Sequence, residues 1–308
     1  MSGDAVESAA QEIGELTLAD RIGPVRVKPI TTTDIPAVAR FLHENLNDRV
    51  AADAWERALQ VPWKVSSPNH GFLLRDPDGD IAGTYLAFYS ERTIDEQRRR
   101  FCNLGAWCVL PPYRFHSLKL IKALLAQEGY EFTDLSPSGN VVPVNTRFGF
   151  SFLDTATALA PTLPWPVLPG QGRISADPSV IEDTLAGDDL QIYRDHAGAA
   201  AARHVVLIRN GRYCYVIFRT DRRRNLPFFA SLLHVSDPDL FHAMQFRFRS
   251  HLLTRHRVLA LLAELRVAGR RPALSRMLAN PRRKMFRSAE LTGDQIDYLY
   301  SELTCLSW

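Results

Sequence analysis

Residues 103–125 have the sequence NLGAWCVLPPYRFHSLKLIKALL, which changes from a strand pattern to a turn and then to a helix pattern. The apolar run that ends at Val109 is typical of a buried strand, and leucine and isoleucine recur at helical spacing after Phe115. Pro111 and Pro112 separate the two elements, because proline fixes φ and removes a backbone donor. Such a strand–turn–helix segment gathers free amides at the positive end of a helix dipole. It therefore predicts an anion site, and a nest of successive amides suits a pyrophosphate.

The flanking sequence has an α/β pattern. Apolar alternation, capping residues and turn signals predict the remaining elements of the first half. They are a strand at 25–30, helices at 35–46 and 53–60, a hairpin over 71–89 with its turn at 76–79, a charged loop at 91–100, a strand at 132–135 and a short helix at 140–148.

This order of elements, together with two motifs, resembles the GNAT superfamily of acyl-CoA-dependent N-acyltransferases. The motifs are VLPPYR at 109–114 and NTRFGF at 145–150, and the resemblance covers about residues 25–155. It implies an α/β fold of the mixed-sheet kind, a mostly antiparallel twisted sheet flanked by helices. It also implies acyl-CoA as co-substrate, most simply acetyl-CoA.

The resemblance places the cofactor along the strand and the following loop. Trp107, Cys108 and Val109 face the pantetheine and thioester in this interpretation. The pyrophosphate then lies on loop residues Arg114, Phe115, His116, Ser117, Leu118 and Lys119.

Three residues depart from the family's pattern. Ser117 and Lys119 stand where the family usually has glycines that let the backbone approach phosphate. Asn145 stands beside the cofactor, where the family commonly has a tyrosine that protonates the departing thiolate. Because an amide has no proton to give at neutral pH, Tyr113 and Ser138 are the candidates for this step.

Acyl transfer to an amine also needs a base. The strand at 101–109 contains no carboxylate, so the base must come from another element. Glu91, at the end of the hairpin, is the chosen candidate; the others are Glu44, His70, Asp134 and His116. Cys108 is interpreted as a small buried hydrophobe rather than a nucleophile.

The proline-rich stretch at 156–177 predicts a linker between a first domain at 24–155 and a second at 178–308, with a flexible leader at 1–23. Segments 70–75 and 204–209 are similar and both begin hairpins, and Asn-Gly at 210–211 is a strong hairpin signal. The second domain is therefore expected to be a degenerate repeat of the first. Asp237 and Asp239 follow its corresponding strand and would repel a phosphate.

Charge also differs between the halves. Residues 1–154 contain 16 basic and 20 acidic residues, and residues 155–308 contain 21 and 14. His234, His242, His251 and His256 have no spacing typical of a metal site, and the four cysteines form no CxxC pair, so no metal is expected. Neither a secretory signal nor a long apolar span is evident, which indicates a cytoplasmic protein without membrane insertion.

The sequence thus predicts an acyl-CoA-dependent N-acetyltransferase for a small amine or amino sugar. Two alternatives remain open at this point. A tandem protein that has lost catalysis would bind a ligand or act as a scaffold. A Fem-type transferase would use aminoacyl-tRNA, although nucleic acid is not the expected partner.

Overall fold

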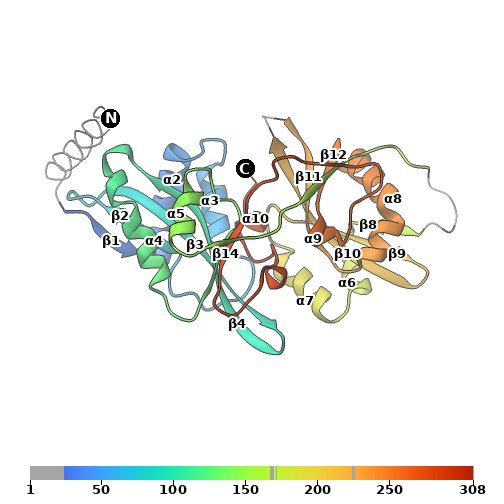
Figure 1. The fold of residues 1–308 in the computed structure, drawn as a ribbon, viewed down its shortest axis with the longest axis horizontal. Coiled ribbons are helices and arrows are strands. Elements are labelled where there is room, and N and C mark those ends of the chain that lie inside the picture. Colours follow the sequence, from blue (N-terminus) through green and yellow to red (C-terminus); the bar gives the residue numbers. More distant parts are fainter. Residues whose placement is uncertain (1–23, 167–169, 171, 224–225, 308) are drawn as a thin grey trace, which may run out of the picture.

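The computed structural model describes residues 24–166, 170, 172–223 and 226–307. They form two seven-stranded sheets that lie side by side, each flanked by helices (Figure 1). This arrangement confirms the predicted α/β fold class with mixed sheets. The predicted leader at 1–23 lies outside the described residues.

The first sheet has the strand order β1-β2-β3-β4-β5-β14-β6. All neighbouring strands run antiparallel except β4 and β5, which are parallel. The strands are β1 (Arg26–Pro29), β2 (Gly71–Arg75), β3 (Ile81–Ile94), β4 (Gln97–Val109), β5 (Glu131–Asp134), β6 (Ser151–Phe152) and β14 (Met285–Arg287).

The second sheet has the order β13-β7-β12-β11-β10-β9-β8. Here too a single neighbouring pair, β11 and β12, is parallel among the described strands. The strands are β7 (Thr157–Pro161), β8 (Arg173–Ser175), β9 (Arg203–Arg209), β10 (Arg212–Arg223), β11 (Leu226–Val235), β12 (Ala260–Glu264) and β13 (Arg276–Met277).

Helices connect the strands and cover the sheets. Those of the first half are the short 3₁₀ helices η1 (Thr32–Asp34) and η2 (Pro111–His116) and the α-helices α2 (Ile35–Asn45), α3 (Ala52–Leu59), α4 (Leu118–Leu125) and α5 (Val141–Arg147). Those of the second half are α6 (Pro178–Thr184), α7 (Gly187–His196), α8 (Pro238–His256), α9 (Leu265–Ala268), η3 (Gly293–Gln295) and α10 (Glu302–Cys305).

The two halves exchange a strand. β7 follows β6 in the chain but pairs with β12 and β13 in the second sheet, whereas β14 pairs with β5 and β6 in the first. The predicted linker at 156–177 therefore contains β7 and β8, and the predicted second domain at 178–308 contains a strand of the first sheet. Figure 1 shows the C-terminal segment, in red, returning to the first sheet.

Two local predictions were wrong. The charged segment 91–100 is not a loop but the tip of a long β3–β4 hairpin, which turns at Asp95 and Glu96 with positive φ. Its arginines pair with carboxylates from the far end of the chain, Arg92 with Asp297 and Arg99 with Glu290. The sequence at 190–194 also predicts a strand, but these residues lie inside α7.

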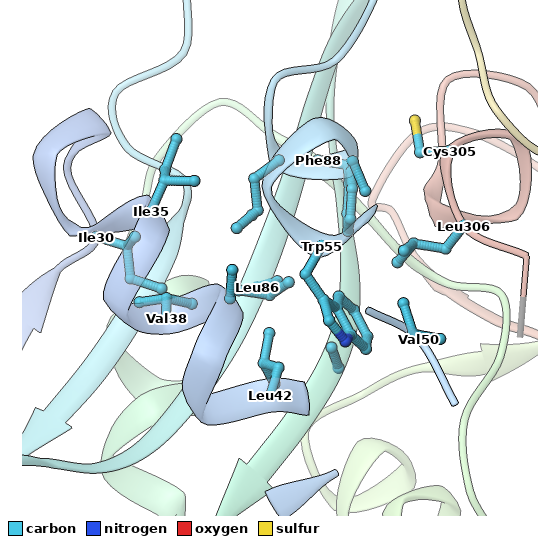
Figure 2. Packing of buried hydrophobic residues seen from close by; sticks show 14 of the residues in the cluster. Ile30, Ile35, Val38, Leu42, Val50, Trp55, Leu86, Phe88, Cys305 and Leu306 are labelled. Atoms are coloured by element: carbon cyan, nitrogen blue, oxygen red, sulfur yellow. The ribbon is translucent and has the colours of Figure 1, made fainter. Parts of the chain in front are cut away.

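The core of the first half includes the C-terminal segment. Ile35, Val38 and Leu42 lie on one face of α2, spaced by three and four residues, and pack over the sheet with α3. Cys305 and Leu306 complete the same cluster (Figure 2). Folding of the first half therefore buries the last residues of α10, which brings a distant part of the chain to the first sheet.

Candidate active site

The parallel strands β4 and β5 diverge part-way along their length. They pair from Phe101 with Glu131 to Leu104 with Asp134, and the pairing ends there. Immediately afterwards β4 contains a bulge against β3, in which Ala106 has a φ of 53°. A bulge bends its strand and leaves the extra residue unpaired, so backbone amides are available at the opening.

A cavity of about 230 Å³ lies in this opening. Its walls come from the end of α2, from β3, from the bulge and from the loop between β5 and α5. The lining residues are Leu46, Asn47, Tyr85, Gly105, Ala106, Trp107, Asp134, Ser136, Pro137, Ser138 and Val141. The cavity is thus largely apolar with a few polar groups, which is the usual make-up of a small-ligand site.

Asp134 is the carboxylate that lines this cavity. It is 3% exposed, and its Oδ2 accepts hydrogen bonds from Asn145 Nδ2 at 2.8 Å and from the Tyr85 hydroxyl at 3.5 Å. Burial raises the pKa of Asp134 to about 6, although these hydrogen bonds oppose the shift. A carboxylate with a pKa close to neutral pH is suited to general-base catalysis.

A second buried carboxyl, Glu302 of α10, lies next to the cavity wall. Its Oε1 accepts a hydrogen bond of 2.6 Å from the hydroxyl of Ser136, and Ser136 lines the cavity. Burial, together with the charge of Asp134, raises the pKa of Glu302 to about 7. No local pattern marks Glu302 as functional in the sequence, because Ser136 and Asn103, to which it hydrogen-bonds, are more than 160 residues away along the chain.

The turn after β4 is the predicted pyrophosphate site. Arg114 and Lys119 are exposed on η2 and at the start of α4, and among the described residues no side chain caps the N-terminus of α4. Burial and the charge of Lys119 lower the pKa of His116. Ser117 and Lys119 do not line the cavity, so these departures from the family pattern leave it unobstructed.

The other predicted cofactor residues have different environments. Trp107 lines the cavity and stacks on Tyr85 with 4.6 Å between the ring centroids. Cys108 is buried, its thiol donates to the Asn45 carbonyl at 3.6 Å, and burial raises its pKa to about 11. Val109 is half-buried. The remaining residues are Phe115, which packs on the His116 ring, Leu118, which is exposed, and Asn145, which is fully buried.

The three predicted catalytic residues are not brought together. Ser138 lines the cavity. The Tyr113 hydroxyl bonds to Asp76 in the β2–β3 turn at 3.3 Å. Glu91 lies five residue pairs along the β3–β4 hairpin from Gly105 and is paired with Arg98.

Solved structures resemble this fold over most of its length. A conserved protein of unknown function from Enterococcus faecalis, described as a probable N-acyltransferase, has a TM-score of 0.55 and 17% identity, covering 88% of this chain and 74% of that one. A GCN5-related N-acetyltransferase from Anabaena variabilis gives 0.55 and 11%, covering 86% and 72%. The chain has the GNAT fold. The resemblance found in the sequence is thereby confirmed for the fold. No family model and no curated protein matches the sequence.

The second sheet has the same strand order as the first but lacks the open cavity. β11 and β12 pair as far as Ser231 with Leu262 and then diverge, and β11 has a bulge at the corresponding place. Leu232 and Leu233 occupy the positions of Gly105 and Ala106. The space left measures about 40 Å³, enough for only one or two water molecules. The second opening is therefore filled by side chains.

Among the described residues, no group of three or more histidine, cysteine, aspartate or glutamate side chains is arranged to hold a metal ion. None of the helices in those ranges has both the length and the apolar character that crossing a membrane requires.

Proposed function

We propose that the protein is an acyl-CoA-dependent N-acyltransferase with one transfer site, located where β4 and β5 diverge. The observation that carries this proposal is the cavity at the β4 bulge, with Asp134 in its wall. The turn that holds Arg114 and Lys119 directly follows β4 in the chain. The bulge amides at Ala106 and Trp107 supply donors for a thioester carbonyl, and the start of α4 supplies amides for a pyrophosphate.

Asp134 acts as the base in this mechanism. The amine nitrogen attacks the thioester carbonyl carbon, its surplus proton passes to Asp134, and the C–S bond breaks to release the CoA thiolate. The bulge amides stabilise the negative charge that develops on the carbonyl oxygen. Ser138, which lines the same cavity, is the candidate to donate a hydrogen bond to the departing thiolate. Asn145 binds Asp134 instead and so orients the base.

Acetyl-CoA and a small amine or amino sugar are the proposed substrates. Support for the acceptor comes from the carboxylate in the cavity, which attracts a cationic amine. A further solved structure with a TM-score of 0.55 is the glucosamine N-acetyltransferase region of a fungal multi-domain enzyme, at 14% identity and covering 86% of this chain and 38% of that one. Amino sugars therefore belong in the acceptor panel.

Isothermal titration with acetyl-CoA tests the binding step. Replacing Arg114 and Lys119 together by alanine should weaken binding about tenfold, since each removes a charge beside the phosphates. The matched control replaces Lys122 and Arg147, which removes the same charge elsewhere on the first half. Absence of binding at millimolar acetyl-CoA, or an equal loss in the control, would contradict the proposal.

Release of CoA thiol with a panel of amines tests the transfer step. Thiol release that depends on the amine supports the transferase. Binding of acetyl-CoA without release under any acceptor favours the tandem ligand-binding alternative. Binding to tRNA that weakens steeply with salt favours the Fem-type alternative.

A further inference from the structure

The C-terminal helix α10 adds a polar contact to the wall of the transfer site. Glu302 is fully buried, its backbone amide donates to Asn103 Oδ1 of β4 at 3.2 Å, and its carboxylate accepts the Ser136 hydroxyl proton. A Cβ added to Gly105 would lie 3.5 Å from the Glu302 Cγ, in ordinary van der Waals contact, so the Glu302 side chain packs directly against Gly105. Glu302 therefore lies directly behind two residues that line the cavity.

This contact fixes the direction of the Ser136 hydroxyl proton, and so which hydrogen-bonding role Ser136 has toward a substrate. A serine hydroxyl has one proton and two lone pairs. Because the proton is held by Glu302, the lone pairs of Ser136 remain to accept a hydrogen bond from the cavity side. An amine N–H is a donor of that kind, so this arrangement orients the acceptor next to Asp134.

The second half of the chain holds α10 in place. Arg219 of β10 donates from Nη1 to the Leu303 carbonyl at 3.0 Å. The Ala201 amide donates to the Thr304 carbonyl at 2.9 Å, and the Tyr300 amide donates to a ring nitrogen of His196 at 3.1 Å. Each of these donors or acceptors outside the C-terminal segment belongs to the second half. The site in the first sheet is thus braced by the second.

Arg219 is the most unusual of these groups. It is 2% exposed, and its Nε lies 3.1 Å from Asp221 Oδ1 on the same strand. A buried guanidinium is costly to desolvate unless it is paired and hydrogen-bonded. The hydrogen bond from Arg219 to the Leu303 carbonyl therefore has a specific structural role, because packing alone would not require a buried charge at this position.

We propose that Arg219 and Glu302 are positioning residues of the transfer site: Arg219 holds α10, and α10 places the Glu302 carboxyl on Ser136, which orients the acceptor amine. This inference rests on the transfer site proposed above. It assigns the second half, whose own opening is filled, a role in acceptor binding at the first.

The pH profile gives a readout that loss of packing would not move. The two carboxyls are Asp134 of β5 and Glu302 of α10, and the titratable and charged groups around them are Tyr85 of β3, Arg219 of β10 and Cys305 of α10. Glu302, with a pKa of about 7, is largely protonated where Asp134 titrates at about 6, so the acidic limb set by Asp134 should stay in place in Glu302→Gln. This variant should instead abolish the change in the acceptor kcat/KM near pH 7 that ionisation of Glu302 causes.

The experiment compares Glu302→Gln, Arg219→Met and a control, Arg249→Met, in the full chain. Arg249 is also a buried arginine of the second half that donates to a carbonyl, that of Pro161, and it does not contact α10 in the described contacts. Arg219→Met should raise the acceptor KM about tenfold, Glu302→Gln should raise it less because the glutamine oxygen can still accept the Ser136 proton, and both should leave the Kd for acetyl-CoA within twofold. Arg219→Met should also speed hydrogen exchange of the Leu303 and Thr304 amides at least tenfold, whereas Arg249→Met should not.

A second variant, Arg219→Met with Asp221→Asn, removes the whole pair and so avoids an unpaired buried carboxylate. It should reproduce the exchange and KM effects of Arg219→Met, and Arg219→Lys should partly reverse them. The proposal is overturned if both Arg219 variants match the Arg249 control, or if Glu302→Gln leaves the pH profile unchanged. If the wild-type protein transfers no acyl group, the proposed function fails, while hydrogen exchange still decides whether Arg219 holds α10.

Discussion

The two places where parallel strands diverge have the same topology, but the first contains an open cavity and the second is filled by side chains. Between β4 and β5 the small residues Gly105 and Ala106 leave a cavity of about 230 Å³ with Asp134 in its wall. Between β11 and β12, Leu232 and Leu233 leave about 40 Å³, and Leu262 stands at the position of Asp134. Strand order therefore creates the opening, and small side chains at the bulge are required for a cavity to form there.

Polar groups beside the two openings also differ in their pairing. At the second, Glu264 is bound by Lys284 and Tyr298, so that its charge is matched. At the first, Asp134 and Glu302 are both carboxyls, and one of the Glu302 oxygens has no hydrogen-bond partner among the described residues. An unmatched buried carboxyl reduces stability, and such groups are concentrated at functional sites.

Filling the first opening should have the largest effect. In Gly105→Leu the side chain must displace Phe88 or Glu302, both within 3.6 Å of the new Cβ. We expect acyl transfer to fall at least 1000-fold, measured as kcat/KM with acetyl-CoA. Leu232→Met, which conserves volume at the matching position, should stay within twofold. Activity within tenfold of wild type in Gly105→Leu would show that this opening is not the site.

Removing the base should have the next largest effect. Asp134→Asn keeps the size of the side chain but cannot accept the amine proton, so kcat should fall about 100- to 1000-fold. The Kd for acetyl-CoA, measured by isothermal titration, should not change. Glu91→Gln is the control, because that carboxylate lies on the distant hairpin. Equal losses in the two variants would argue against Asp134 as the base.

Opening the second sheet should reduce stability without creating a site. Leu232 is 2% exposed, and Leu→Ala at buried positions costs about 2–5 kcal/mol in the free energy of unfolding. Chemical denaturation measures this loss, with Leu259→Ala as the exposed control. Acetyl-CoA should still bind at one site per chain. Binding of a second molecule of acetyl-CoA per chain in Leu232→Ala would contradict this expectation and mean that the side chains at the bulge alone decide binding.

The buried carboxyl should also make stability depend on pH. Since the folded state raises the pKa of Asp134 to about 6, it binds the proton more tightly than the unfolded chain. The stabilisation is complete below about pH 4 and is lost as pH rises through 6, by about 3 kcal/mol. Denaturation of wild type and Asp134→Asn between pH 4 and 8 isolates this effect. A constant difference between the two proteins would contradict it.

Local sequence was sufficient for the elements that local interactions determine. The strand–turn–helix at 103–125 is present as β4, η2 and α4. The Asn210-Gly211 turn is confirmed as well, since both residues have the positive φ that a tight hairpin needs. Each of these features depends on residues within a few positions of one another.

The exchanged strands and the role of Glu302 could not be predicted from the sequence. β14 has three residues, and its partners lie more than 130 positions away, so no periodicity identifies its sheet. The charged segment 91–100 looks like a loop because its carboxylate partners, Asp297 and Glu290, come from the other end of the chain. Asp134 was one candidate base among five, and only the geometry of the opening distinguishes it.

The number of acetyl-CoA molecules bound per chain tests the central claim most directly. Isothermal titration of the full chain should give one molecule, because the first opening holds a cavity and the second is filled by Leu232 and Leu233. A stoichiometry of two would contradict the account of the second sheet, and no binding at millimolar acetyl-CoA would contradict that of the first.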